Sequence, residues 1–297
     1  MLLNAAALAG LQTAFRMDFN GGHAVAQTYY EQIATRVPSI TAQNQYPWLG
    51  DLPGIREWIG DREVHKLAQH DYAIVNKPWE MTVGVNRDHI KDDIFGVYSP
   101  MFETMGFETA RFPDQLIFQA LLAGFDTNCY DGQYFFDTDH PGYDENGDPD
   151  SVSNYQSGSA AAWFLLDTRR PLKPLIYQER EMFNFVAMDQ TTDEAVFNRK
   201  EFRYGVDGRM NVGYGFWQQA IGSKKTLDAT NFNAAYASMM GFRKRDGNPM
   251  GIKPNLLVVG STNRAAALEV VKAERAANGA TNINRDAVDV LIVEWLP

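Results

Sequence analysis

A long β-type run followed by a long helical run constrains this chain more than any other feature. Residues Tyr72–Val85 alternate apolar and polar side chains over their second half, which is typical of a strand with one buried face. From Asp92 to about Asp126, apolar residues recur at helical spacing. Pro113 lies inside this run and Gly124 near its end, so we expect a break or kink at the proline and a helix end at the glycine. The pattern predicts an α+β protein.

A second β-type run, Arg62–Gln69, comes just before the first. The short polar connection His70-Asp71 between them suits a turn, so the pair predicts a long hairpin at about residues 60–88. A two-stranded ribbon has little stability by itself. We therefore expect this hairpin to pack against another chain.

The first forty residues resemble a loosely attached arm. An amphipathic helix is predicted over residues 2–19, ending at Gly21-Gly22, with a short helix at Gln27–Ala34 and an extended polar segment at Thr35–Trp48. Such an arm cannot bury its apolar stripe alone, so we expect it to lie on the body or on a neighbouring subunit. The stripe consists of Leu3, Ala7, Leu8, Leu11 and Phe15.

The remainder of the chain begins with a turn-rich stretch, Asp126–Ser159, which predicts a surface loop. Beyond it, helices are predicted at Asn231–Arg245 and Ser261–Ala277. Strands are predicted at Trp163–Leu166, Leu175–Gln178, Phe183–Met188, Glu201–Val206, Tyr214–Ala220, Asn255–Val259 and Val288–Leu296.

Charge and composition exclude several classes of protein. The 297 residues carry a formal net charge of −10 without a basic run of five or more, whereas a protein that grips nucleic acid normally shows a basic stripe. We therefore expect DNA to be met only non-specifically. No run of eighteen apolar residues occurs, so no membrane span is predicted. The single cysteine, Cys129, excludes an intrachain disulfide framework and a cysteine-rich metal site.

The most chemical-looking stretch surrounds Asp137, Asp139 and His140, which could form a metal-assisted hydrolase site. Beyond it, the spacing of Asp144, Asn146, Asp148 and Asp150 imitates a calcium loop. Its glycine, however, stands at the fourth position instead of the sixth, and no glutamate stands at the twelfth. Asp, Asn, Gly and Pro are also the residues of any exposed turn. We expect no catalytic residue, no metal and no cofactor.

Aromatic and basic residues of the first ninety positions are candidate interface residues, because Trp and Arg are frequent anchors of protein–protein contacts. The candidates for contact between subunits are Trp48, Trp58, Arg62, Lys66, Lys77, Trp79 and Arg87.

Seven groups of residues, in order along the chain, carry a resemblance to a known family. Together they resemble the major head subunit of Mu-like phages and prophages. The groups are Trp48-Leu49-Gly50 with Glu57-Trp58-Ile59-Gly60; Asn76-Lys77-Pro78-Trp79-Glu80 with Thr82-Val83-Gly84; Pro113-Asp114-Gln115-Leu116-Ile117-Phe118; Cys129-Tyr130-Asp131-Gly132-Gln133 with Phe135-Phe136-Asp137; Asp139-His140-Pro141; Pro174-Leu175-Ile176-Tyr177-Gln178-Glu179-Arg180; and Gly213-Tyr214-Gly215-Phe216-Trp217-Gln218.

The resemblance implies the tailed-phage and herpesvirus-type major capsid fold. Its parts would be an N-terminal arm at 1–44, an entry segment with an extended hairpin (the E-loop) at 45–91, and a spine helix of the peripheral domain at 92–126. Residues 127–297 would supply discontinuous segments of the peripheral and axial domains.

The implied function is structural. The chain would assemble with itself, in the host cytoplasm, into pentamers and hexamers of an icosahedral virion head that encloses double-stranded DNA. Further partners would be a scaffold or protease, a portal and decoration proteins, with no membrane involved. A tail or decoration subunit, a stand-alone binding module and the hydrolase described above are the alternatives.

Overall fold

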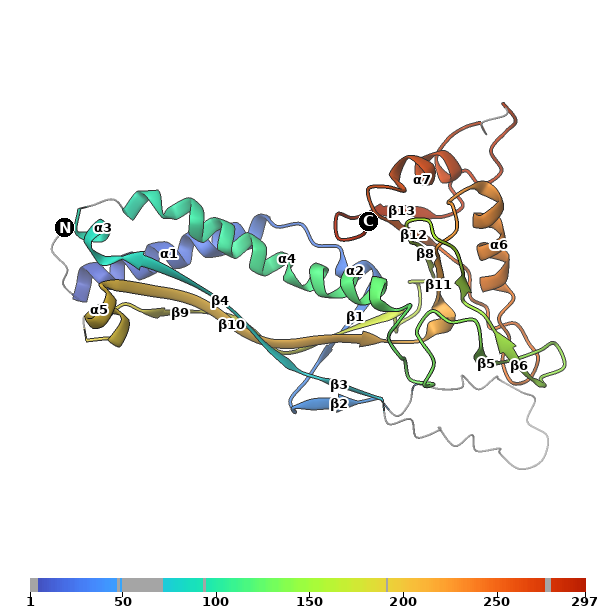
Figure 1. Cartoon of the computed structure of the whole chain (residues 1–297), viewed down its shortest axis with the longest axis horizontal. Coiled ribbons are helices and arrows are strands. Elements are labelled where there is room, and N and C mark those ends of the chain that lie inside the picture. The colour runs from blue at the N-terminus through green and yellow to red at the C-terminus, as the bar shows by residue number, and fades with distance from the viewer. Residues whose placement is uncertain (1–4, 47–48, 50–71, 93–94, 191, 276–278) are drawn as a thin grey trace.

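Two β-sheets at opposite ends of an elongated chain define the architecture (Figure 1). The computed structural model describes residues 5–46, 49, 72–92, 95–190, 192–275 and 279–297. Within these ranges, a four-stranded sheet has the order β1-β9-β10-β4 and a five-stranded sheet has the order β13-β12-β8-β11-β7.

The four-stranded sheet is built around β9 and β10, two strands of fourteen residues that pair antiparallel. β4 pairs antiparallel with β10, and β1 runs parallel to β9. The bounds are Ala34–Pro38 for β1, Lys77–Asn86 for β4, Leu175–Met188 for β9 and Glu201–Tyr214 for β10. The sequence predicted two runs where β9 is continuous, because residues 179–182 interrupt the apolar pattern, although Glu179 and Glu181 still pair with β10 across a register shift.

The prediction that Tyr72–Val85 forms one strand of a free hairpin is wrong. Residues Tyr72–Val85 divide into β3 (Ala73–Val75), which pairs with β2 (Gln43–Gln45), and β4, which pairs with β10 over ten residues. Val85 is fully buried, so β4 belongs to a core and is not a free ribbon. The first run of the predicted hairpin, Arg62–Gln69, lies outside the described residues.

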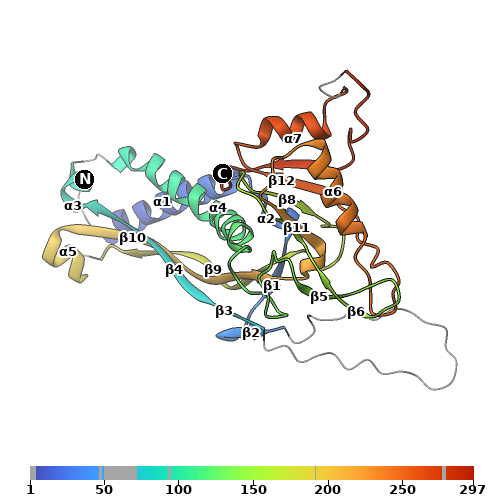
Figure 2. The ribbon, with the colours of Figure 1, turned by 45° about the vertical axis from the view of Figure 1, so that its right-hand side comes forward.

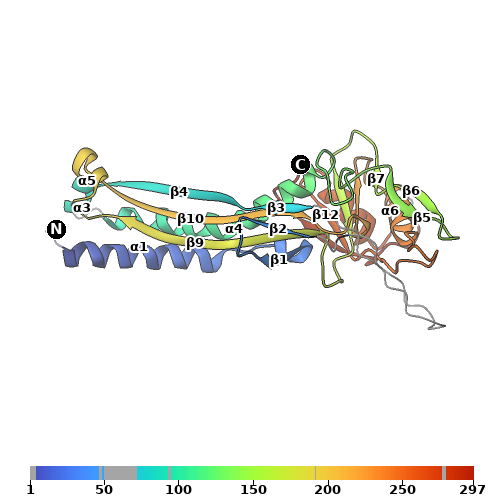
Figure 3. The ribbon, with the colours of Figure 1, turned by 90° about the horizontal axis from the view of Figure 1, so that it is seen from below.

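Two long helices, α1 (Ala5–Val25) and α4 (Ser99–Ala123), cover one face of the four-stranded sheet (Figure 3). The stripe of α1 is buried there, as predicted for Leu8, Leu11 and Phe15. Phe15 stacks on Phe102 of α4, with ring centroids 4.1 Å apart, and meets Tyr204 of β10 edge to face at 5.2 Å. The N-terminal segment therefore lies on the body of its own chain.

α1 does not end at Gly21-Gly22 as predicted but continues to Val25. The reason is its close crossing with α4. A Cβ on Gly22 would meet the backbone of Glu103, and a Cβ on Gly106 would meet the backbone of Phe19. The glycines allow the two helix backbones to approach, and this packing outweighs the unfavourable helix propensity of glycine.

α4 also continues through Pro113, where the sequence predicted a break or kink, and ends before Gly124 as predicted. The neighbouring Asp114 connects α4 to the segment of the chain that follows α1. The Asp114 carboxylate, 1% exposed, accepts hydrogen bonds from the backbone N–H groups of Tyr29 and Tyr30, at the start of α2 (Tyr30–Ile33). Burial raises the pKa of this carboxyl group, against the effect of the two N–H donors.

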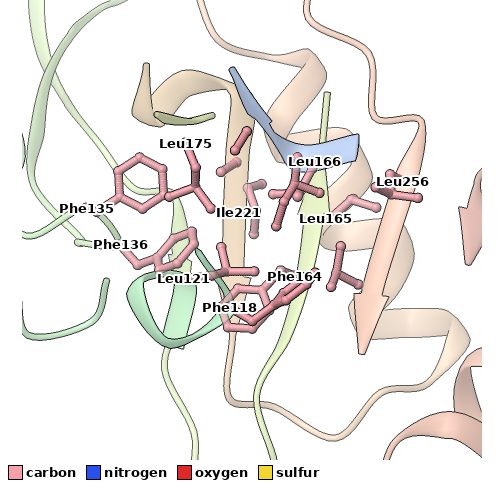
Figure 4. Packing of buried hydrophobic residues seen from close by; sticks show 14 of the residues in the cluster. Phe118, Leu121, Phe135, Phe136, Phe164, Leu165, Leu166, Leu175, Ile221 and Leu256 are labelled. Carbon is pink, nitrogen blue, oxygen red and sulfur yellow. The ribbon is translucent and has the colours of Figure 1, made fainter. Parts of the chain in front are cut away.

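The five-stranded sheet, with α6 and α7 beside it, forms the other end of the molecule (Figure 2). The end of α4 enters its core, where Phe118 and Leu121 meet Phe136, Phe164 and Ile221 (Figure 4). The elements are β7 (Tyr155–Gln156), β8 (Trp163–Leu166), β11 (Ala220–Ser223), α6 (Ala229–Met240), β12 (Leu256–Val259), α7 (Arg264–Val271) and β13 (Asp289–Ile292).

Two stretches of this end differ from the predictions. The turn-rich stretch predicted as loop contains a hairpin, β5 (His140–Tyr143) and β6 (Pro149–Val152). The strand predicted at Tyr214–Ala220 is instead the end of β10, a 3-10 turn η2 (Trp217–Gln219) and the start of β11. Both contain many aromatic or glycine residues, whose local pattern does not separate a strand from a turn.

Three short helical elements complete the described chain, namely α3 (Arg87–Lys91), the 3-10 turn η1 (Phe95–Val97) and α5 (Glu194–Arg199). α3 and α5 lie at the far end of the long sheet (Figure 1). Among the described residues, none of the helices is both long and apolar enough to cross a membrane.

The helix crossing predicts a large contrast between two glycine substitutions. Gly106→Ala should lower the free energy of unfolding by about 1–3 kcal/mol, because its methyl group meets backbone that cannot rotate away. Gly10→Ala is the matched control, since Gly10 lies in α1 with open space around it; there alanine should raise stability by about 0.5–1 kcal/mol. Urea unfolding measures both, and equal effects would contradict the close crossing.

Candidate assembly surfaces and a buried polar cluster

Four of the seven residues predicted to contact other subunits, Trp48, Trp58, Arg62 and Lys66, lie outside the described residues. The other three lie on or just after β4. Lys77 is exposed at the start of the strand. Contact between subunits stays a prediction for all seven.

Trp79 is used within its own chain. Its indole N–H donates to the backbone oxygen of Met210 at 3.1 Å, and its ring meets Phe112 of α4 edge to face at 4.9 Å. It therefore fixes α4 against the sheet, and only part of its surface is available to another subunit.

Arg87 begins α3 and is half-buried. Its backbone N–H donates to the oxygen of Lys200, which ties α3 to the end of α5, and its Nε lies 3.9 Å from the Asp88 carboxylate.

The sequence analysis did not identify a further exposed apolar residue near Arg87. Phe197 of α5 is 82% exposed, which is unusual for a phenylalanine. The sequence pattern does not reveal the exposure of Phe197, because an apolar residue in a short helix is usually buried.

The predicted chemical stretch contains a buried polar cluster of Cys129, Asp131 and His140. The Asp131 carboxylate lies 2.7 Å from His140 Nδ1 and accepts from the Cys129 thiol at 3.0 Å and from the Gln133 backbone N–H at 3.1 Å. The His140 ring is 0% exposed and stacks on Trp217 with centroids 4.1 Å apart. Next to the cluster is a cavity of about 720 Å³.

The hydrolase site expected from the sequence is not assembled. The carboxylate that contacts His140 is Asp131, which sequence reasoning passed over, and Asp139 is exposed. Asp137 instead accepts from the backbone N–H groups of Tyr134 and Thr138 and so stabilises its own turn. A residue nine positions from His140 offers no sequence signal, since only the turn at Gly132 brings them together.

The ionisation of the cluster follows from its hydrogen bonds. Burial opposes the charge on Asp131, but hydrogen bonds from His140 and Cys129 outweigh it, so the Asp131 pKa is lowered. Burial, together with the Asp131 charge, raises the pKa of the Cys129 thiol. The thiolate needed for nucleophilic or metal chemistry is therefore disfavoured.

The cluster also offers ligand atoms that a metal ion could bind. The three side chains offer one ligand atom each within 4.8 Å of one another, and sulfur, nitrogen and oxygen are ligands that zinc accepts. Yet the Asp131 carboxylate already accepts from the Cys129 thiol and lies against His140 Nδ1, and only the buried His140 Nε2 lacks a hydrogen-bond partner among these ligand atoms. The structure supports a buried anchor that holds the loop after α4 against η2.

The calcium-like spacing is explained by a turn. Asp144 Oδ1 accepts from the backbone N–H groups of Asn146 at 2.8 Å and Asp148 at 2.9 Å. The hydrogen bond from the Asp148 N–H is the main cause that lowers the Asp144 pKa.

Comparisons with known proteins agree with one another on the class. A sequence profile described as "Mu-like prophage major head subunit gpT" matches residues 8–296. The chain is 46% identical over 273 residues to the Mu-like prophage FluMu major head subunit of Haemophilus influenzae, covering 89% of each chain. It is 39% identical over 292 residues to the major capsid protein of Escherichia phage Mu, covering 96% of each.

Solved structures give the same result. A chain of the bacteriophage JBD30 procapsid superposes with a TM-score of 0.87 at 47% identity, covering 99% of this chain and 100% of that one. A chain of the JBD30 capsid gives a TM-score of 0.81 at 34% identity, with 100% of each chain covered. The expected tailed-phage major capsid fold is confirmed.

The fold and these relatives define a structural capsid protein and not an enzyme. The chain belongs to the Mu-like prophage major head subunit family.

The Asp131 hydrogen bonds predict a pH-dependent effect of Asp131→Asn. The ordinary pKa of the carboxyl is 3.8 and the folded value is lower. The stabilisation of the fold by the ionised Asp131 carboxylate is therefore fully present above pH 3.8, and it is lost as the pH falls through the lower pKa of the folded state. The variant should be less stable by about 2 kcal/mol at neutral pH, and the difference should shrink in acid. Urea unfolding of both proteins from pH 7 to about 3 tests this; a difference independent of pH would contradict it.

The hydrogen-bonded cluster also predicts indifference to chelation. Treatment with EDTA followed by added zinc should shift the melting temperature by less than the roughly 2–4 °C that 1 kcal/mol produces. Cys129→Ser, which keeps a donor toward Asp131, is the control and should respond in the same way. Thermal unfolding with metal analysis of the purified protein measures this, and a zinc-dependent rise lost in the variant would show a metal site instead.

Proposed function

We propose that this chain assembles with itself into pentamers and hexamers of an icosahedral head that encloses double-stranded DNA, as a component of the virion. The observation that carries the proposal is the likeness over the full chain to subunits of an assembled procapsid and capsid. A shell requires one chain to make several different contacts, and each specific contact would bury on the order of 1,600 Å².

The sheet edges of the long domain support this proposal. β4 has one neighbour among the described strands, β10, so the other edge of this ten-residue strand is open there. An open edge of this length offers backbone donors and acceptors to another chain. Lys77 lies at the start of this edge. We propose that β4 and the predicted contact residues Lys77 and Arg87 face a neighbouring subunit.

The predicted entry segment and E-loop, 45–91, include residues 50–71, which lie outside the described residues. The Tyr46 N–H donates to the Tyr72 oxygen at 2.9 Å, so the chain leaves and re-enters the body at neighbouring points. Because Tyr46 and Tyr72 lie together, a change in the residues between them need not disturb either sheet. We propose that Trp48, Trp58, Arg62 and Lys66 contact the next subunit.

Charge supports a passive relation to DNA. A chain of formal net charge −10 repels phosphate, so a shell made of it would contain DNA without binding it tightly. We propose non-specific contact with packaged DNA.

Further assembly partners are proposed from the relatives of this chain. The JBD30 capsid is described as decorated with minor capsid protein trimers, so we propose a decoration protein as a partner. A scaffold or protease and a portal, the other partners that the family resemblance implies, are proposed as well.

Electron microscopy tests the proposed assembly. Negative staining of the full chain, purified or co-expressed with the other head proteins, should show capsomers or closed shells. Tubes or small rings would instead indicate a tail or decoration subunit, and a protein that stays monomeric at high concentration would indicate a stand-alone binding module.

The E-loop proposal predicts a separation of folding from assembly. Replacing residues 51–70 with a short Gly-Ser linker should leave the melting temperature nearly unchanged, because Tyr46 and Tyr72 already lie together. Closed particles should be lost. A deletion extended through β4 is the contrast and should prevent folding, since it removes a strand of the sheet. Normal shells from the linker variant would contradict the proposal.

A further inference from the structure

Two turns at the end of the molecule opposite to α1 are locked together and carry opposite charges. One is the tip of the β5–β6 hairpin, with the sequence Asp144-Glu145-Asn146-Gly147-Asp148. The other follows α6, with the sequence Lys244-Arg245-Asp246-Gly247-Asn248. We name them the acidic turn and the basic turn.

The two turns have the same backbone pattern. In the acidic turn, the Gly147 N–H donates to the Asp144 oxygen and the Asp144 N–H to the Asp148 oxygen, at 3.2 and 2.9 Å. In the basic turn, Gly247 donates to Lys244 and Lys244 to Asn248, both at 2.9 Å. The glycines have φ values of +83° and +73°, a left-handed conformation in which other residues are strained.

The glycines also hold the turns against each other. A Cβ on Gly147 would meet the backbone oxygen of Arg245, and a Cβ on Gly247 would meet that of Glu145. The contact is reciprocal and involves backbone on both sides. The relative position of the two turns is therefore built into the fold, and the charges they carry are held in place.

The charges on this surface lack ion-pair partners within the described chain. Residues 144–150 carry four carboxylates, and residues 243–245 are three cations in a row in a chain of net charge −10. Glu145, Asp148 and Arg245 are exposed. Across the described residues, no ion pair joins Glu145, Asp148, Lys244 or Arg245 to any side chain, although thirteen other ion pairs are present.

We propose that the acidic turn of one subunit docks against the basic turn of a second copy of this chain within the same capsomer. This rests on the proposed function, since it assigns a contact inside the assembly. A closed ring uses head-to-tail contacts, in which one patch of each subunit meets a different patch of the next. The acidic turn and the basic turn are two such patches, because they carry opposite charges and lie side by side at one end of the molecule. Such complementarity sets orientation and register more than affinity.

A charge-swap experiment tests the contact. The first variant carries Glu145→Lys and Asp148→Lys, and the second carries Lys244→Glu and Arg245→Glu. None of these side chains makes a hydrogen bond that holds its turn. Each variant should reduce the yield of closed particles at least about tenfold, because like charges then face each other. The four substitutions together should restore the yield, because the attraction returns with its direction reversed.

A matched control separates this contact from net charge. It combines Glu145→Lys and Asp148→Lys with Lys225→Glu and Arg264→Glu, two exposed cations elsewhere on the same end. This variant has the same net charge as the fourfold swap and should remain defective. Melting temperatures within a few degrees of wild type would show that all variants fold. Raising the salt to about 1 M, where the screening length is roughly 3 Å, should lessen the defect of the single-turn variants.

The results separate the inference from the proposed function. Sedimentation and negative-stain counts of particles are measured under conditions in which the wild-type chain forms shells; if it forms none, the proposed function fails first. If wild type assembles and either single-turn variant assembles equally well, the docking contact is wrong. Rescue by the control as well as by the swap would also overturn it. The docking contact would also be wrong if the Lys244→Glu and Arg245→Glu variant formed normal shells that contain less DNA, since these two residues would then face DNA.

Discussion

The long helix α4 is buried at both of its ends in different cores, and the arrangement of the molecule depends on this. Its first half places Phe102 and Met105 in the core under α1, and its last turns place Phe118 and Leu121 in the core of the five-stranded sheet. β9 and β10 also contribute to both cores. One helix and two strands therefore connect the two ends, and a change of angle between the ends would have to break packing in at least one core.

The close contacts along α4 explain how the N-terminal segment becomes part of this body. Gly22 and Gly106 bring α1 against α4. Asp114 then binds the start of α2 through two backbone N–H groups. A buried carboxylate that accepts such hydrogen bonds is stabilising only while both donors stay in place. The segment after α1 is thus guided to β1 at the edge of the sheet.

At the other end, hydrogen-bonded polar residues hold loops beside a core of buried aromatic residues that includes Phe135 and Phe136. Asp131 joins His140 and Cys129 beneath the β5–β6 hairpin, and Trp217 covers the imidazole. The tip of that hairpin is held in turn by the glycine contact with the basic turn. These two sets of contacts fix the position of the hairpin relative to the turn after α6 and to η2.

The sequence by itself determined the α+β class, the end of the long helix before Gly124, the apolar stripe of α1 and most strands after residue 160, because these depend on local periodicity and capping. The ordered residue groups also determined the family. Only the tertiary structure decided the rest. β4 became part of a sheet because its partner, β10, lies more than a hundred residues later. The glycines of α1 stayed helical because a second helix packs on them. Asp131, not Asp137 or Asp139, reached His140 because the turn at Gly132 sets the direction of the loop. Such contacts depend on what meets across space, which no local pattern records.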